Sequence, residues 1–316
     1  KKKAIIVGSE GQDGRLLYGL LLRKGYEVIG VDLHVVRSNC CAGLIPSVDI
    51  ANKEQVSDFI NLIKPSEVYY LAAFHQSSED AEIDDFALFN KSYAVNVNGL
   101  IHCLEAIRRY SQDTRLFYAA SSHIYGSSEA MGLLDEDSLI NPDGIYGITK
   151  STGLFTCRFY RNRHKIFTSV GILFNHESSF RSMKFVSAKI INTAQDIKKG
   201  ERTKLVLGDL NAEIDWGYAP DYVDAMNRML KHNRPDDFVV ATGVAHTVRD
   251  FVRIAFEYIG LDYRDYVEEN PAIVTKKALR RVGNPKKLME VTGWKPSVDF
   301  SQMIKAIIDK EDRIDV

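Results

Sequence analysis

A glycine-rich turn between an apolar strand and a helical pattern is the feature that most constrains how this chain folds. Residues 4–7 are apolar, Gly8, Gly11 and Gly14 follow at three-residue spacing, and residues 15–22 have the apolar periodicity of a helix. Glycines in this context allow a tight turn, a close approach of backbone to a pyrophosphate, and close packing of helix on strand. Free N–H groups at the helix start would bind the diphosphate. Because turns use glycine for many reasons, the flanking strand and helix are what predict a dinucleotide-binding loop.

The next predicted strand, residues 27–31, ends at Asp32, 18 positions after Gly14. A carboxylate near this spacing binds the ribose hydroxyls of NAD, and its charge would repel the 2′-phosphate of NADP. The sequence therefore favours NAD as the cofactor. Arg37 keeps NADP open as the alternative, because arginine is a favoured phosphate ligand.

The Gly-x-x-Gly-x-x-Gly spacing resembles the short-chain dehydrogenase/reductase superfamily, whose Tyr-x-x-x-Lys pair is present here as Tyr146 and Lys150. Residues four apart share a helix face, and a nearby lysine cation favours a phenolate. Ser121 ends an apolar run at 116–120, where parallel strands place functional groups, and its hydroxyl could hydrogen-bond the reacting oxygen. The Tyr/Lys pattern alone could be a solvated helix surface. The glycine loop, Ser121 and the Tyr/Lys pair in this order predict a catalytic site.

The composition is that of an ordinary soluble globular protein, with 45% hydrophobic and 26% charged residues and a formal net charge of −1. This charge argues against nucleic acid or an anionic membrane as the main partner, and no apolar run reaches the ~20 residues of a transmembrane helix. The four cysteines form no Cys-x-x-Cys pair and no metal-ligand cluster is visible. We therefore expect no metal site, and reduced thiols in the cytoplasm.

Strands alternate with helices through the first half of the chain, which predicts an α/β fold with a doubly wound, Rossmann-like parallel sheet. We assign residues 1–175 to a dinucleotide-binding domain. Shorter segments and loops then follow, so residues 176–316 are predicted to form a smaller, interleaved lobe that binds substrate. A segment near 237–242 is expected to return to the main sheet.

Several longer strings resemble one family. They are residues 171–178 (Gly-Ile-Leu-Phe-Asn-His-Glu-Ser), 207–219, 221–226 and 292–296. Together with the loop at 8–14, they are similar to the GDP-mannose 4,6-dehydratases, which are extended short-chain dehydrogenases/reductases. The resemblance implies a nucleotide-sugar substrate, with a GDP-sugar favoured, and transient oxidation at the sugar 4-position by a bound nicotinamide. It also implies a homodimer or homotetramer, and a place in surface-polysaccharide biosynthesis.

The resemblance and the motifs together give the expected site residues. The catalytic set is Ser121, His123, Tyr146 and Lys150. Cofactor contacts are expected from Gly8, Gly11, Gln12, Asp13, Gly14, Asp32, Arg37, Asp49, Ile50, Leu71, Ala72, Ala73, Tyr146 and Lys150. Substrate contacts are expected from Ser122, Asn175, His176, Glu177, Arg181, Lys184 and Asp215.

The chain departs from the family at the residue two places after the catalytic serine. The dehydratases have glutamate there, as the acid/base for loss of water across the sugar 5- and 6-positions, whereas this chain has His123. Removing a positioned general base typically costs ~10²–10⁴-fold in rate. Histidine has a suitable pKa to replace it but a different shape. His123 is thus either a substitute base or a residue that only fills space or orients substrate.

Three arginine positions of the family are also changed. The family's Pro-Arg-Arg after Asn-His-Glu-Ser is Ser179-Phe180-Arg181, the arginine before Asp-Trp is Ile214, and a later Arg-Pro is Val274-Thr275. Because arginine is the favoured bidentate phosphate ligand, an altered grip on the nucleotide diphosphate is expected. Four nearby cations could compensate or could simply form a solvated face: Lys276, Lys277, Arg280 and Arg281.

Three functions compete on these grounds. The first is a redox enzyme at the 4-position of a nucleotide sugar: a dehydrogenase, reductase or epimerase. The second is a 4,6-dehydratase in which His123 moves the protons. The third is a non-catalytic sensor that binds the cofactor, although a sensor needs no Ser/Tyr/Lys set. We favour the first because the oxidation machinery is complete and the family's glutamate is missing.

Overall fold

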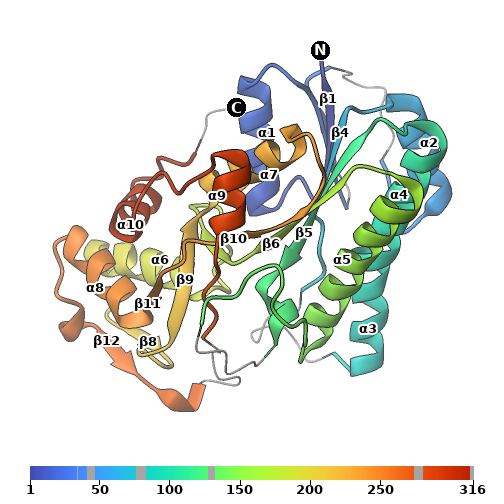
Figure 1. Cartoon of the computed structure of the whole chain (residues 1–316). Helices are drawn as coiled ribbons and strands as arrows, with labels where there is room; N and C mark the ends of the chain where they lie inside the picture. The colour runs from blue at the N-terminus through green and yellow to red at the C-terminus, as the bar shows by residue number, and fades with distance from the viewer. Residues whose placement is uncertain (34, 41–46, 76–82, 127–131, 274–279, 314–316) are drawn as a thin grey trace.

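The computed structural model describes residues 1–33, 35–40, 47–75, 83–126, 132–273 and 280–313. Figure 1 shows a larger α/β part and a smaller lobe beside it. The strands are β1 (Lys3–Val7), β2 (Glu27–Asp32), β3 (Val35–Ser38), β4 (Glu67–Tyr70), β5 (Arg115–Ser121), β6 (Thr168–Leu173), β7 (Asn175–Glu177), β8 (Leu205–Leu207), β9 (Glu213–Tyr218), β10 (Asp237–Val240), β11 (Ala245–Thr247) and β12 (Val267–Glu269).

The helices complete this list. The α-helices are α1 (Gln12–Arg23), α2 (Lys53–Ile63), α3 (Asp85–Tyr93), α4 (Gly99–Tyr110), α5 (Ile145–His164), α6 (Val186–Lys199), α7 (Ala219–Lys231), α8 (Val248–Tyr258), α9 (Lys286–Thr292) and α10 (Phe300–Ile308). Four short helical turns are η1 (Ala94–Asn98, a π-helix), η2 (Ser122–Tyr125), η3 (Tyr263–Asp265) and η4 (Pro271–Ile273).

The main sheet has the strand order β10-β6-β5-β4-β1-β2-β3. Every neighbouring pair is parallel except β2 and β3. The predicted doubly wound parallel sheet is therefore confirmed, with an antiparallel edge strand added. β3 runs antiparallel because the two residues between Asp32 and Val35 are too few for a crossover. The chain order reverses between β1 and β4, and the carboxyl ends of strands at such a point are where α/β sheets bind ligands.

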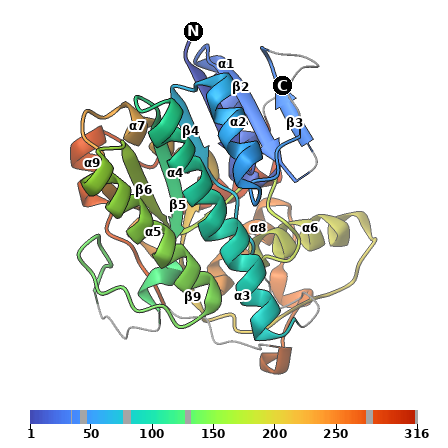
Figure 2. The same cartoon turned by 90° about the vertical axis from the view of Figure 1, so that its right-hand side faces the viewer.

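Helices cover both faces of the main sheet, as Figures 1 and 2 show. One face packs against α2, α4 and α5, and the other against α1, α7 and α9. All residues of β4, β6 and β10 are buried, which is expected for strands covered on both sides. This double cover fixes the sheet, so the side chains at its carboxyl edge have a rigid support.

The smaller lobe has its own core. Its strands form a three-stranded sheet, β11-β9-β7, and a two-stranded sheet, β12-β8. Side chains from α6, α8 and α10 pack with them around Trp216 and Phe251. Only Phe174 separates β6 of the main sheet from β7 of the lobe, and β10 returns from the lobe region to pair with β6. The chain thus passes between the two parts more than once.

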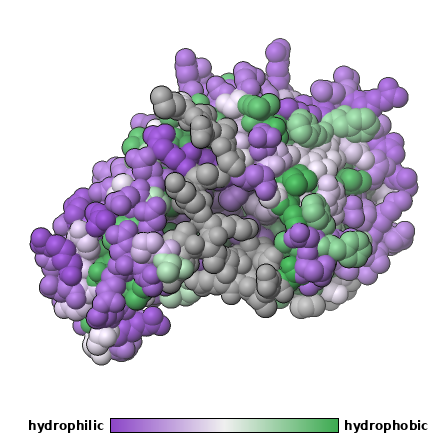
Figure 3. Space-filling model, turned by 90° about the horizontal axis from the view of Figure 1, so that it is seen from below, coloured by the Kyte–Doolittle hydropathy of each residue, from purple (hydrophilic) through white to green (hydrophobic). Residues whose placement is uncertain are grey.

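The surface seen from below in Figure 3 is largely hydrophilic where its residues are coloured, with apolar residues in scattered groups. Within the described ranges, no helix combines the length and apolar character needed to cross a bilayer. The same ranges hold no group of three or more His, Cys, Asp or Glu side chains arranged to hold a metal ion.

Candidate active site

The glycine loop connects β1 to α1 at the point where the strand order reverses. Gly8 has a φ of +92°, and a Cβ placed on it would lie 2.7 Å from the backbone nitrogen of Ala72. A Cβ on Gly14 would lie 2.2 Å from the carbonyl oxygen of Gly8. Packing therefore requires glycine at both positions. A Cβ on Gly11 would meet only the Gly8 oxygen, at an ordinary 3.5 Å, so the protein leaves the space over Gly11 open. An open Gly11 beside a helix N-terminus fits a bound dinucleotide diphosphate.

Of the two other expected cofactor segments, one lies after the end of β4 and the other leads into α2. The backbone nitrogens of Leu71 and Ala72 both donate to the carbonyl oxygen of Val7, which holds the chain after β4 against the glycine loop. Asp49 and Ile50 lie just before α2, where the Ile50 carbonyl oxygen is 2.9 Å from Nδ1 of His102. The structure thus brings residues 71–73 beside the loop and places Asp49 and Ile50 on the chain that enters α2.

A second carboxylate joins Asp32 at the expected ribose end of the loop. Oδ2 of Asp32 accepts a 2.9 Å hydrogen bond from the Glu10 backbone nitrogen, and Oδ1 accepts one from Leu33. Glu10 lies within 3.4 Å of the Arg37 guanidinium and 3.2 Å of that of Arg15. The charge of Arg37 is therefore already paired. Sequence reasoning missed Glu10, although a carboxylate inside the glycine loop was visible as a signal.

Ser121, Tyr146 and Lys150 meet at the carboxyl end of β5. Ser121 is the last residue of that strand, and Tyr146 and Lys150 lie one turn apart near the start of α5. The Ser121 hydroxyl lies close enough to the Tyr146 side chain to lower its pKa. Nζ of Lys150 donates to the Ala119 carbonyl oxygen at 2.8 Å and lies 5.6 Å from the centroid of the Tyr146 ring. The structure therefore brings a buried hydroxyl and a buried amine together with a partly buried phenol.

Burial dominates the electrostatics of this cluster. It raises the pKa of Tyr146 to about 12, while the charge of Arg181 and the hydrogen bond from Ser121 act to lower it. Burial also lowers the pKa of Lys150 to about 7, against the charge of Asp13. Both shifts penalise the charged forms that a phenolate base needs. A proton-transfer role for Tyr146 therefore depends on the cations around it.

Two histidines flank the Tyr146 ring. The ring centroid of His123 lies 5.6 Å away and that of His75 lies 4.7 Å away, both in edge-to-face contacts. The backbone nitrogen of His123 donates to Ser121 Oγ at 3.3 Å, so η2 follows directly on the end of β5. Sequence reasoning missed His75, which lies just after residues 71–73 but belongs to no motif that marks it.

A buried asparagine in η1 was also missed. The Asn96 side chain accepts from the backbone nitrogen of Phe74 and donates to its carbonyl oxygen, and it donates to Thr149 Oγ1 at 2.9 Å. It therefore joins the segment that carries His75 to the first turns of α5. An asparagine inside an amphipathic helix pattern was the available signal. Its contacts depend on the π-helical turn, and single-sequence periodicity does not predict such a turn.

The expected substrate residues divide into two groups. Asn175, His176 and Glu177 form β7, and Glu177 is paired with Arg181 at 3.2 Å and accepts from Ser187. His176 faces the glycine loop, where its Nε2 lies 2.9 Å from Asp13 Oδ2. Ser122 is buried in η2, whereas Lys184 is exposed in the loop before α6.

The one remaining expected substrate residue, Asp215, lies in β9 of the smaller lobe. The Asp215 carboxylate accepts four hydrogen bonds, from the backbone nitrogens of Thr242, Gly243 and Gly283 and from the Thr242 hydroxyl. Its accepting capacity is thus used within the protein. Ile214, at one lost arginine position, packs against the core of the lobe.

Both described cations among those suggested as compensation have partners within the protein. Arg280 pairs with Glu213 at 2.7 Å. Arg281 donates to the Gly126 carbonyl oxygen at 3.0 Å, at the end of η2. The other positions, 274–277, lie outside the described residues.

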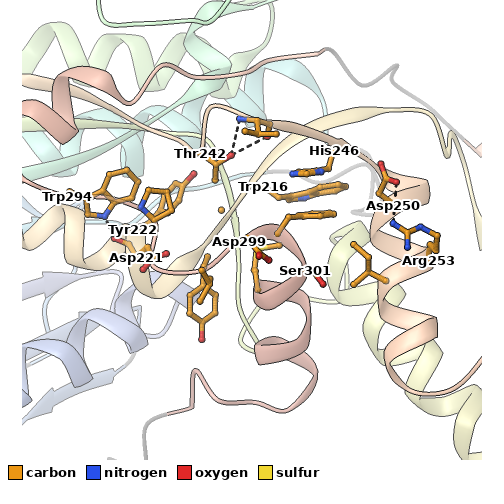
Figure 4. A pocket seen from close by; sticks show the side chains of 18 residues that line it. Trp216, Asp221, Tyr222, Thr242, His246, Asp250, Arg253, Trp294, Asp299 and Ser301 are labelled. Carbon is orange, nitrogen blue, oxygen red and sulfur yellow. Dashed lines mark hydrogen bonds and ion pairs between the residues drawn. The ribbon is translucent and has the colours of Figure 1, made fainter.

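A cavity of about 540 Å³ lies where the smaller lobe meets α7 of the larger part, and α8, α10 and the strands β9 and β11 also line it (Figure 4). Trp216, His246 and Phe300 contribute stacked rings to its wall. None of the expected catalytic or glycine-loop residues lines it. The cavity is therefore separate from the cluster around Tyr146.

The family model for GDP-mannose 4,6 dehydratase matches residues 5–307. The chain belongs to this family. It is 36% identical to GDP-mannose 4,6 dehydratase 2 of Arabidopsis thaliana over 333 residues, which covers 98% of this chain and 87% of that protein. Solved structures with the same fold include RMD of Pseudomonas aeruginosa complexed with NADPH (TM-score 0.83, 19% identity, 99% of each chain). Another is dTDP-glucose 4,6-dehydratase of Bacillus anthracis in complex with NAD (TM-score 0.80, 18% identity, 99% and 97% of the chains).

Proposed function

We propose that this protein uses a nicotinamide cofactor to oxidise or reduce the 4-position of a nucleotide sugar, with a GDP-sugar favoured. It would act as a 4-dehydrogenase, reductase or epimerase. The observation that carries the proposal is the cluster of Ser121, Tyr146 and Lys150 beside a glycine loop, in a chain whose family acts on GDP-mannose but which has His123 where the dehydratases have a glutamate. Residues 1–175 would hold the cofactor and residues 176–316 the sugar nucleotide.

The proposed chemistry begins with proton removal from the 4-hydroxyl of the sugar. Tyr146, as phenolate, takes this proton, and Ser121 holds the same oxygen by a hydrogen bond. When bound, the nicotinamide supplies the acceptor for the hydride that leaves carbon 4, so a 4-keto sugar results. Lys150, whose Nζ lies 5.6 Å from the centroid of the Tyr146 ring, would support the phenolate and also hold the nicotinamide ribose. Return of hydride and proton to either face of the ketone would complete reduction or epimerisation.

The proposed cofactor is NAD. Asp32 and Glu10 place two carboxylates at the expected ribose end, and the charge of Arg37 is paired with Glu10. A 2′-phosphate would meet the carboxylate of Asp32 there, and the nearest guanidinium already has a carboxylate partner. We predict that NAD binds at least about tenfold tighter than NADP, and that Asp32→Ala reduces this preference. Titration of both cofactors by calorimetry measures this. Tighter binding of NADP to the unaltered protein would refute the assignment.

A 4,6-dehydratase is the second candidate, because the similarity to the Arabidopsis enzyme spans 98% of this chain. In that case His123, whose ring lies 5.6 Å from that of Tyr146, would replace the glutamate as the acid/base for loss of water. An imidazole can both donate and accept a proton, which is what this role requires. The two candidates differ in one product: water is lost only in the second.

Mass spectrometry of products from a panel of GDP-, UDP-, CDP- and dTDP-sugars separates them. The first candidate predicts loss of two hydrogens by oxidation, gain of two hydrogens by reduction of a 4-keto sugar, or an epimer of unchanged mass, in each case without loss of water. A 4-keto-6-deoxy product that disappears in His123→Ala would refute the first candidate and support the 4,6-dehydratase. His123→Glu is the matched variant, because it restores the family's carboxylate and tests whether the 5-proton lies within reach.

We further propose a cytoplasmic homodimer or homotetramer, on the basis of the family resemblance. Light scattering on the purified protein measures its mass in solution.

A further inference from the structure

The partly buried Asp13 and the buried His176 form a contact between the glycine loop and the smaller lobe. Nε2 of His176 lies 3.0 and 2.9 Å from the two carboxylate oxygens of Asp13. Nδ1 lies 2.7 Å from the carbonyl oxygen of Phe174, which can only accept, so Nδ1 carries a proton. An ionised carboxylate is likewise only an acceptor, so Nε2 carries the second proton. This geometry describes an imidazolium paired with a carboxylate.

The groups around the pair are few and can be named. The Tyr222 ring stacks on His176 at 4.4 Å, and Arg181 faces both members of the pair. Burial acts to lower the pKa of His176, but Asp13 overrides this and holds it above its ordinary value. Burial acts to raise the pKa of Asp13, and His176 reverses that shift too. Lys150 and Tyr146 are further titratable groups in the range of the Asp13 charge.

The position of Asp13 poses a problem for cofactor binding. It lies in the first turn of α1, whose N–H groups would bind the two negative charges of a pyrophosphate. An uncompensated carboxylate there would repel the ligand that the helix attracts, and such repulsion is strong in a buried setting. His176 is the cation in hydrogen-bond contact with Asp13.

We propose that His176, as an imidazolium, neutralises Asp13 and thereby lets the glycine loop accept the cofactor diphosphate. His176 is then a positioning residue of the cofactor site and not a substrate ligand. The inference rests on the proposed function, because it requires a dinucleotide at this loop.

Gln12 holds the loop to β7 without using the imidazole, and its Nε2 also donates to Asp13 Oδ1 at 3.3 Å, so the charge of His176 can be removed while this link is kept. Nε2 of Gln12 donates to the His176 carbonyl oxygen at 3.0 Å, and Oε1 of Gln12 accepts from the Ser178 hydroxyl at 2.8 Å. These bonds do not use the imidazole. Replacing His176 by glutamine therefore removes the charge while the backbone link between loop and β7 remains.

The test is the dissociation constant of NADH, measured by its fluorescence from about pH 6 to pH 9, across the range where a histidine with a raised pKa titrates. We expect His176→Gln to bind about tenfold or more weakly at pH 6, where the unaltered protein has its imidazolium. Asp13→Asn/His176→Gln should regain most of that affinity, because it removes the charge that needed compensation. In the unaltered protein the affinity should fall as the pH rises and His176 loses its charge. Asp13→Asn alone should lack this fall, because it has no carboxylate to neutralise.

Lys150 titrates in the same interval, so the variants are compared with one another at each pH. His164→Gln, at the far end of α5, is the matched control and should leave the affinity unchanged. Equal affinity of the unaltered protein and His176→Gln at pH 6, or a double variant as weak as the single one, would overturn the inference while the proposed function stands. If neither NADH nor NADPH binds the unaltered protein, the proposed function fails and the inference falls with it.

Discussion

The chemistry proposed here depends on one phenol. Burial raises the pKa of Tyr146 to about 12, and Ser121, Lys150 and Arg181 are the groups that can offset this. Tyr146→Phe removes the proton acceptor but keeps the ring that contacts His75 and His123. We therefore predict a loss of turnover of ~10²–10⁴-fold with cofactor binding retained. Single-turnover reduction of NAD with the active sugar nucleotide measures the first quantity, and NADH titration the second. Turnover near that of the unaltered protein would remove Tyr146 from the mechanism.

The π-helical turn η1 positions two segments that meet at the site. Asn96 is fully buried, and its side chain satisfies both backbone groups of Phe74 and contacts Thr149. Asn96→Ala would leave both partly buried backbone groups of Phe74 without this partner, at a cost of up to about 1–3 kcal/mol for each group, whereas the Thr149 hydroxyl keeps its bond to the Tyr146 carbonyl oxygen. We predict a free energy of unfolding lower by about 2 kcal/mol or more, measured by urea denaturation. Asn98→Ala, at an exposed position of the same turn, is the control and should change it by less than about 0.5 kcal/mol.

The elements that were predictable from sequence are those whose signals are local. Ser121 follows an apolar run, and Tyr146 and Lys150 have helical spacing, so the strand end and the helix face could both be inferred. His75 and Asn96 join the site only through tertiary packing. His75 follows a strand end that carries no motif, and Asn96 lies in a π-helical turn. The antiparallel β3 likewise depends on chain reversal after Asp32, which periodicity does not encode.

The pairing of Asp13 with His176 also links the two parts of the molecule, and this link has a pH dependence of its own. The pKa of His176 is raised in the folded protein, so its contribution to stability is fully present below about pH 6.5 and is lost as the pH rises through the folded value. The pKa of Asp13 is lowered, so its contribution is present above about pH 4 and is lost as the pH falls through the folded value. The stabilisation from the pair should therefore be largest near pH 5–6.5 and smaller at pH 9.

We predict that, without cofactor, the thermal midpoint of His176→Gln lies below that of the unaltered protein by about 2 °C or more at pH 6, and that this gap narrows by pH 9. Other titrating groups shift both proteins alike, so the difference between the two midpoints isolates this contact. A gap that stays constant from pH 6 to pH 9 would mean that His176 contributes through packing against Tyr222 and not through its charge.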